Sequence, residues 1–202
     1  MRVQSKAGSP PLQVRESGRV VWITGLSGAG KTTLARELIS RLRERGEPVV
    51  CLDGDELRSV FEGDQADPGG HDRRSRLALA MRYARLCRTI AAQGLTVVIS
   101  TISLFREVHG WNRAHLPGYF EVYLNVPVEV LRRRDPKGIY RRFERGELRD
   151  VAGLDLAVDE PSAPDWQPAF EPARDAAALA CELMQRLTDL RPPPLRLPAG
   201  HL

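Results

Sequence analysis

Residues 25–32 read GLSGAGKT and fit the pattern GxxxxGK[ST] of a glycine-rich loop that leads into a helix. Glycines let the backbone N–H groups of such a loop turn inward, and the start of the helix adds partial positive charge, so the loop can hold a polyphosphate. Lys31 would bridge the β- and γ-phosphates, and Thr32 would offer its hydroxyl to Mg²⁺. The spacing therefore predicts a site for ATP and Mg²⁺. An ordinary glycine turn that caps a helix is the alternative interpretation.

Two carboxylates, Asp53 and Asp55, follow the second strand-like run of the sequence. The carboxyl ends of the strands in an open parallel sheet face the ligand crevice, so both side chains should lie across from the phosphates. There they can order magnesium-bound water and accept a proton from an attacking hydroxyl. We therefore expect Lys31, Asp53 and Asp55 in the catalytic site, with Thr32 and Asp53 at the metal. A turn or a helix cap would explain the same acidic residues without any chemistry.

Strand-like and helical segments alternate along the chain, and this alternation would place both motifs at one edge of a sheet. Apolar runs predict strands at 20–24, 48–52, 95–100 and 119–124, the first three continuous enough to be covered on both faces. Apolar residues three or four apart predict helices from Lys31 to a stop at Gly46, through 77–91 and through 177–187. We expect an α/β fold of the P-loop NTPase type, with three layers and a mainly parallel sheet of about five strands.

Length and composition indicate one ordinary domain. The chain has 202 residues, 42% of them hydrophobic and 28% charged, which argues against a disordered, collagen-like or membrane protein. No apolar run approaches the roughly 18 residues of a membrane span, and the N-terminus lacks the apolar core of a secretory signal. We therefore expect a cytoplasmic protein with no membrane partner. Residues 1–18 and 191–202 lack periodicity and are interpreted as tails around a domain at 19–190.

The cysteines agree with a reducing compartment. Cys51, Cys87 and Cys181 lie far apart, without CxxC spacing, in apolar stretches. This placement favours buried thiols over disulfides or metal ligands.

Basic residues are mostly arginine: of 30, only Lys6, Lys31 and Lys137 are lysine. The arginines alternate with Glu and Asp along helices, which is typical of solvated helix faces and predicts no nucleic-acid partner, despite the net charge of +4. A chain with so few lysines should place them where a guanidinium would not serve. Two of the three fall in segments that would handle phosphate.

The phosphate loop, the DGD of residues 53–55 and the RRDPKGIY of residues 133–140 together resemble the adenylylsulfate (APS) kinases. These enzymes use ATP to phosphorylate the ribose 3′-hydroxyl of APS. Further motifs carry the resemblance over roughly residues 20–165: Arg58 after the DGD, the pair Asp72-Arg73, STISLF at 100–105, and GLD at 153–155 with Pro161.

The resemblance implies a role for each matched residue. Asp55 becomes the general base or hydroxyl-orienting group, Arg58 and Arg73 grip the anionic part of the acceptor, and the basic segment 132–145 forms a lid that excludes water. The ATP-binding residues implied are Gly25, Ser27, Gly28, Ala29, Gly30, Lys31, Thr32, Thr33 and Arg134. The acceptor-binding residues implied are Arg58, Arg73, Arg76, Ser103, Phe105, Lys137 and Leu154. A solvated basic helix end is the alternative for the lid, and the family also implies a possible homodimer.

The base-reading positions depart from the family pattern. APS kinases hold the acceptor adenine between two phenylalanines, but residues 67–73 here read DPGGHDR, Val151 stands at the second position, and Arg76 replaces an asparagine. Stacking is worth roughly 1–3 kcal/mol per base, so adenine recognition should be weaker unless His71 or Trp111 replaces it. The predicted small-molecule acceptor is therefore APS, or another nucleotide conjugate such as cytidine diphosphoramidate. A non-catalytic nucleotide-binding module is the third interpretation.

Overall fold

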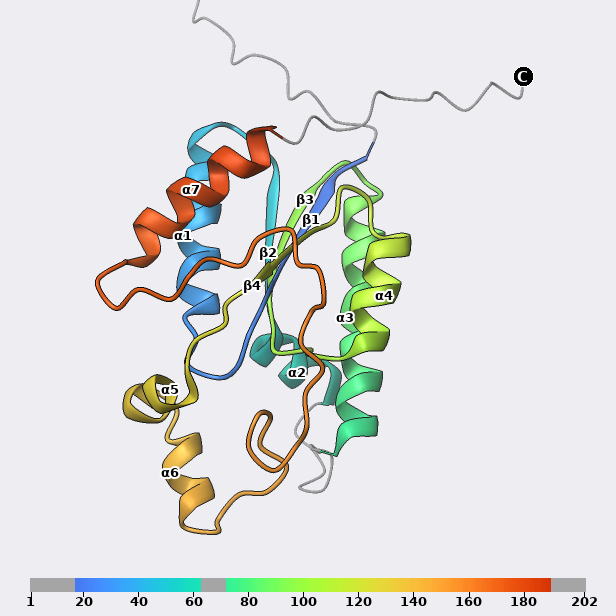
Figure 1. The fold of residues 1–202 in the computed structure, drawn as a ribbon. Helices are drawn as coiled ribbons and strands as arrows, with labels where there is room; N and C mark the ends of the chain where they lie inside the picture. The colour runs from blue at the N-terminus through green and yellow to red at the C-terminus, as the bar shows by residue number, and fades with distance from the viewer. Residues whose placement is uncertain (1–16, 63–71, 190–202) are drawn as a thin grey trace, which may run out of the picture.

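The computed structural model describes residues 17–62 and 72–189, and Figure 1 shows a sheet with helices on both sides. Four parallel strands form this sheet in the order β2-β3-β1-β4. Their bounds are β1 Arg19–Thr24, β2 Val49–Asp53, β3 Thr96–Ser100 and β4 Phe120–Tyr123. All four predicted strands are confirmed, and because they run parallel, their carboxyl ends meet at one edge.

Helices cover both faces of the sheet, which confirms the three layers (Figure 1). One face carries α1 (Lys31–Glu44) and α7 (Ala176–Asp189), and the other carries α3 (Arg73–Ala91) and α4 (Arg106–His115). Successive side chains of a strand point to opposite faces. Val21 and Ile23 of β1 accordingly join the apolar cluster under α1 and α7, while Val20 and Trp22 join the one under α3 and α4. A continuous apolar strand thus supplies both cores.

Three shorter helices lie at the carboxyl edge of the sheet (Figure 1). They are α2 (Gly54–Glu62), α5 (Val128–Arg134) and α6 (Ile139–Glu144). Helix α2 begins directly after β2, so the backbone turns at the DGD motif. The basic segment 132–145, which is expected to form a lid, runs from the end of α5 through the whole of α6.

The sheet has four strands where about five were expected, because the last one is reduced to a single bridge at Trp166. Trp166 donates its N–H to the Glu121 carbonyl at 3.0 Å and accepts from the Tyr123 N–H at 2.9 Å. In a parallel ladder the next residue to donate an N–H to β4 would be two positions on, at 168. Residue 168 is a proline, which has no N–H to donate. The ladder therefore ends after one residue.

Two expectations about burial are wrong. β2 is not covered on both faces like β1 and β3, because it lies at the edge of the sheet, and Cys51 on it is exposed. Of the three thiols expected to be buried only Cys87 is, since Cys181 on α7 is exposed as well. All three are free thiols, as expected.

Several sequence predictions concern residues outside the described ranges. These are the N-terminal tail up to residue 16, the C-terminal tail and the stretch 67–71 with His71, so the division into tails and one domain stays a prediction. Within the described ranges, no helix combines the length and the apolar character needed to cross a bilayer.

The different burial of the thiols gives a direct test of this packing. Burial raises the pKa of the Cys87 thiol to about 12, so at pH 8 it is protonated as well as shielded. We expect Cys51 and Cys181 to react with Ellman's reagent in the native protein, and Cys87 to react only in denaturant. Cys87→Ala is the matched control, with two reactive thiols under both conditions. Three thiols reacting at one rate in the native wild type would contradict the packing.

Candidate active site

The glycine-rich loop joins β1 to α1 and needs glycine at its turns. Gly25 has a φ of +148°, and a Cβ there would lie 2.6 Å from the carbonyl oxygen of Leu124. Gly30 caps the start of α1 with a φ of +92°, a region that other residues rarely adopt. The Lys31 amine bends back over the loop and donates to the Leu26 carbonyl at 2.8 Å. This geometry fits a phosphate-binding loop at the N-terminus of a helix.

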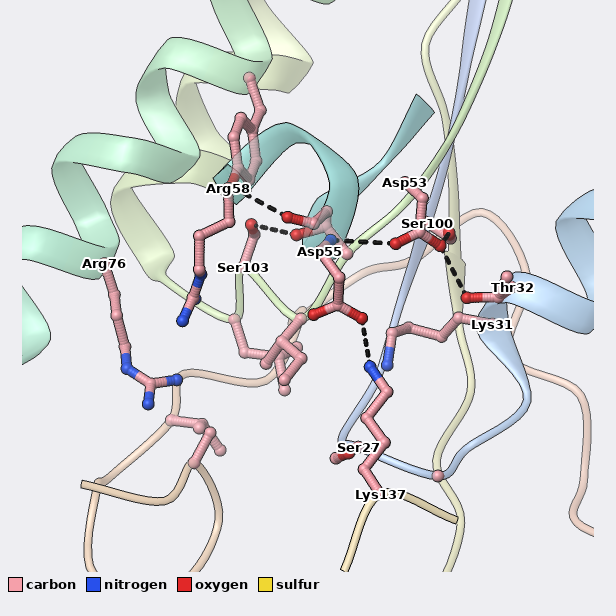
Figure 2. Close-up of a pocket in the computed structure, with 18 of the residues that line it drawn as sticks. Ser27, Lys31, Thr32, Asp53, Asp55, Arg58, Arg76, Ser100, Ser103 and Lys137 are labelled. Atoms are coloured by element: carbon pink, nitrogen blue, oxygen red, sulfur yellow. Dashed lines mark hydrogen bonds and ion pairs between the residues drawn. The ribbon is translucent and has the colours of Figure 1, made fainter. Parts of the chain in front are cut away.

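Asp53 lies where three elements meet at the carboxyl edge (Figure 2). Its Oδ2 accepts hydrogen bonds from the Thr32 hydroxyl of α1 at 2.7 Å and the Ser100 hydroxyl of β3 at 2.8 Å. Its Oδ1 accepts from the Asp55 N–H at 2.9 Å, at the start of α2. Burial alone would raise the pKa of Asp53, but these hydrogen bonds and the Lys137 charge outweigh it and hold the pKa below its usual value. The carboxylate is therefore ionised at neutral pH.

Lys31 is the buried cation of the site. Burial, together with repulsion from Lys137, lowers its pKa to about 8, although Asp55 and Asp53 oppose the shift. A phosphate placed over the loop would add negative charge beside this amine and restore its full protonation.

The lid reaches the site through Lys137, whose amine forms an ion pair with the Asp55 carboxylate (Figure 2). The two side chains are 51% and 70% exposed, and ion pairs this exposed contribute about 1 kcal/mol or less. Bound phosphates can therefore compete for Lys137. The base of the lid is fixed more firmly, since the Tyr140 hydroxyl donates to the Ser27 carbonyl at 2.9 Å and the buried Asp135 carboxylate accepts the Tyr140 N–H at 3.1 Å.

A cavity of about 450 Å³ extends from the glycine-rich loop past Asp55 to the opposite wall. Arg58 and Arg76 point into this far half, away from Lys31 (Figure 2). The Arg76 guanidinium also donates to the Asp150 carbonyl at 2.7 Å. Apolar side chains complete the far half: Leu79, Tyr83, Leu104, Phe105, Ala152, Leu156, Ala157 and Val158. A mixed wall of cations and apolar groups suits a nucleotide conjugate.

The loop after β3 bends sharply into the cavity. Ser103 is not a glycine but has a φ of +31°, and its hydroxyl lies 2.8 Å from that of Thr101. The Thr101 N–H donates to the Ile23 carbonyl at 3.0 Å, which ties the loop to β1. Backbone strain of about 1–3 kcal/mol is retained where the surroundings over-determine it, often at functional sites.

Most of the predicted site residues line this cavity. They are Ser27, Gly28, Gly30, Lys31, Thr32, Thr33, Asp53, Asp55, Arg58, Arg76, Ser103, Phe105, Arg134 and Lys137. Four others lie outside its lining: Gly25, Ala29, Arg73 and Leu154. Arg73 is held by Asp159 at 2.8 Å and Glu107 at 3.3 Å, and Leu154 packs against the apolar cluster under α1 and α7.

Three residues that organise the site, Ser100, Tyr83 and Tyr140, have no role among the sequence predictions. Ser100 is the last residue of β3 and pairs with Asp53 at the end of β2. Its position at the end of a predicted strand could have indicated the hydrogen bond to Asp53. Tyr83 donates to the Gly54 carbonyl at 3.1 Å and Tyr140 anchors the lid. Tyr140 ends the RRDPKGIY motif, which was the available signal for it, whereas Tyr83 occupies an apolar helical position and belongs to no motif.

A smaller cavity of about 60 Å³ lies on the other side of the glycine-rich loop. Ala29, Asn125, Phe170 and Arg174 line it, and Arg134 lines both cavities. The Arg134 guanidinium lies 5.4 Å from the centre of the Phe170 ring, a cation–π distance. The phosphate loop thus lies between two cavities.

The residues at the loop suit Mg²⁺. Thr32 and Asp53 offer hydroxyl and carboxylate oxygens, the hard donors that Mg²⁺ prefers, and Asp53 is ionised. Among the described residues no cluster of three or more acidic, histidine or cysteine side chains could hold a metal by itself. Mg²⁺ in kinases is typically held by one or two carboxylates with substrate phosphates, so the donor set fits.

Comparisons with known proteins show which family the chain resembles. The family model described as adenylylsulphate kinase matches residues 17–167. A cytidine diphosphoramidate kinase of Campylobacter jejuni is 36% identical over 144 residues, 71% of this chain and 82% of that protein. An adenylyl-sulfate kinase of Chloroflexus aurantiacus is 41% identical over 149 residues, 74% of this chain and 78% of that protein. A solved Mycobacterium tuberculosis APS kinase, in complex with AMPPNP and APS, aligns with a TM-score of 0.76 at 31% identity, covering 86% of this chain and 99% of that one.

The parallel sheet and the loop over its carboxyl edge put the protein in the class of P-loop kinases. Within that class, the chain belongs to the adenylylsulphate kinase family. It is a phosphotransferase with a nucleotide substrate, and the interpretation as a non-catalytic module is wrong.

The lowered pKa of Lys31 predicts that nucleotide binding takes up protons. With a pKa of about 8 the free amine is half-protonated at pH 8, and phosphates would complete its charge. Calorimetry of ADP binding in two buffers of different ionisation enthalpy should therefore show uptake of about half a proton at pH 8. Lys31→Arg, which keeps the charge but does not titrate, is the matched control and should show none. Equal uptake by both proteins would contradict the assignment of the titrating group.

Proposed function

We propose that the protein transfers the γ-phosphoryl group of MgATP to the ribose 3′-hydroxyl of APS. The observation that carries the proposal is the position of Asp55, between Lys31 at the phosphate loop and the arginine pair of the far half (Figure 2). A hydroxyl held at Asp55 lies next to whatever phosphate the loop presents.

The chemistry divides among residues of this chain. The 3′-oxygen attacks the γ-phosphorus in line, the bond from phosphorus to the β,γ-bridging oxygen breaks, and ADP leaves with the electron pair. Asp55 accepts the hydroxyl proton or orients the hydroxyl. Lys31 neutralises the charge on the transferring group, and Lys137 can join it when phosphates draw it from Asp55. Mg²⁺, bound through Thr32 and Asp53, would supply further neutralisation of the β- and γ-oxygens.

The smaller cavity is proposed to take the donor base. The loop fixes the phosphates between the two cavities, and the larger one contains the arginine pair suited to the acceptor. A purine on the other side would lie against the Arg134 guanidinium and the Phe170 ring, both of which bind flat π-systems well. This placement supports Arg134 as an ATP-binding residue.

A second acceptor, cytidine diphosphoramidate, is favoured by the composition of the far wall. Val151 stands where the family has its second phenylalanine, and Ala152 and Leu156, which line the cavity next to it, are aliphatic, so a base finds no aromatic face on this side of the far half. Arg76 adds donors where the family pattern has an asparagine. One of the similar proteins is named for this acceptor, while the others named above support APS.

One assay decides between the acceptors. Purified protein with MgATP is given APS, cytidine diphosphoramidate or no acceptor, and ADP release is followed while ³¹P NMR locates the new phosphomonoester. We expect turnover with APS and a phosphate on the 3′-oxygen. Turnover with the cytidine compound alone would overturn APS as the acceptor and keep the reaction type. ADP release that no acceptor stimulates would contradict both. Lys31→Ala is the control, expected to lose transfer while remaining folded.

The cytoplasmic location and the homodimer stay predictions. Light scattering of the purified protein is the direct test of the homodimer.

A further inference from the structure

A polar cluster lies behind the far wall of the larger cavity, outside the site itself. Its centre is Glu121 of β4, whose side chain is 3% exposed. The carboxylate lies 2.7 Å from Nδ1 of His109 and accepts from the Tyr119 hydroxyl at 2.9 Å and the Arg113 guanidinium at 3.3 Å. A buried carboxylate is tolerated only when paired and hydrogen-bonded in this way.

The two ring nitrogens of His109 connect different parts of the fold. Its Nε2 lies 3.1 Å from the Asp159 carbonyl oxygen, which can only accept, so Nε2 is the donor of this hydrogen bond. Its Nδ1 lies 2.7 Å from the Glu121 carboxyl group, which also accepts from Tyr119 and Arg113. His109 therefore joins β4 to the segment at Asp159.

Asp159 holds the segment around residues 156–159 in place through several hydrogen bonds. Its N–H donates to the Leu104 carbonyl at 3.0 Å, and its carboxylate accepts from the Arg73 guanidinium at 2.8 Å and the Arg106 N–H at 3.2 Å. The three residues before it, 156–158, line the larger cavity. Residues 147–175 contain no helix and only isolated bridges, so a few backbone hydrogen bonds and the side-chain bonds at Asp159 hold this wall.

We propose that His109 is a positioning residue for the acceptor, acting through the Asp159 carbonyl on the wall formed by residues 156–158. The inference rests on the proposed function, which assigns that wall to the acceptor. Arg73 of α3 bonds to Asp159 and to Glu107 of α4, so the same junction also connects the wall to both helices. His109 lines neither cavity and touches no reacting atom.

The test compares His109→Ala with His115→Ala, a matched histidine on the same helix whose contacts are with Trp111 of that helix, a hydrogen bond to its carbonyl at 2.8 Å and a stack on its ring. Hydrogen–deuterium exchange reads the amides of 156–160 without any acceptor, and steady-state kinetics gives the KM for ATP and for the acceptor. Loss of this one hydrogen bond should raise exchange in 156–160 and the acceptor KM by about tenfold each in His109→Ala. The KM for ATP should stay within about twofold of wild type, and His115→Ala should match wild type throughout. His109→Gln, which can still donate to the carbonyl, should recover most of the acceptor KM.

Unchanged exchange of residues 156–160 in His109→Ala would overturn the proposal. Faster exchange with an unchanged acceptor KM would overturn it as well, and so would equal changes in the KM for ATP and the KM for the acceptor. If His109→Ala does not fold, the ¹⁵N spectrum of the wild-type ring decides, because an unprotonated Nε2 contradicts the bond on which the proposal depends. Absence of turnover by the wild type would contradict the proposed function, while exchange would still show whether His109 fastens the wall.

Discussion

The site depends on the carboxylate of Asp53, because one side chain holds together the start of α1, the end of β3 and the start of α2. Only a parallel sheet with β2 beside β3 and β3 beside β1 brings these three ends within reach of each other. The phosphate loop and the DGD turn are thus two parts of one junction. Hydrogen bonds to an ionised group are the stronger kind, and this junction keeps Thr32 aimed at the place where a metal-bound phosphate would lie.

The two lysines near this junction differ in how far their side chains are exposed to solvent. Lys31 is buried and depends on phosphate for its full charge, while Lys137 is exposed and paired with Asp55, which it can leave at small cost. The segment that carries Lys137 is anchored at Tyr140. On the opposite side of the cavity, the far wall is irregular backbone, held through Asp159. A phosphate loop built between a strand and a helix thus faces a wall whose shape depends on a few hydrogen bonds and ion pairs.

Local sequence patterns predicted the parts of this fold that are locally determined. The strand runs, α1 with its stop at Gly46, and the glycine-rich loop follow from spacing and from backbone freedom, and all are present. The exposure of Cys51 depends on which strand takes the edge of the sheet. The sequence around Pro168 already makes a poor strand, and the pairing of Trp166 with β4 decides that only a single bridge remains. Arg73 shows the same limit in the site, since its pairing with Glu107 and Asp159 joins residues 34 and 86 positions away. His109 shows this limit too, since its partners Glu121 and Asp159 lie 12 and 50 positions away and it belongs to no motif.

The central claim is that Asp55 acts on the acceptor hydroxyl and not on ATP. The most direct measurement is the steady-state kinetics of Asp55→Asn, which keeps the size of the side chain and removes its basicity. The account predicts that kcat falls by about 10²–10⁴-fold while the KM for ATP stays within about twofold of wild type. A rise in the KM for ATP with an unchanged kcat would make Asp55 a donor-site residue and contradict the account.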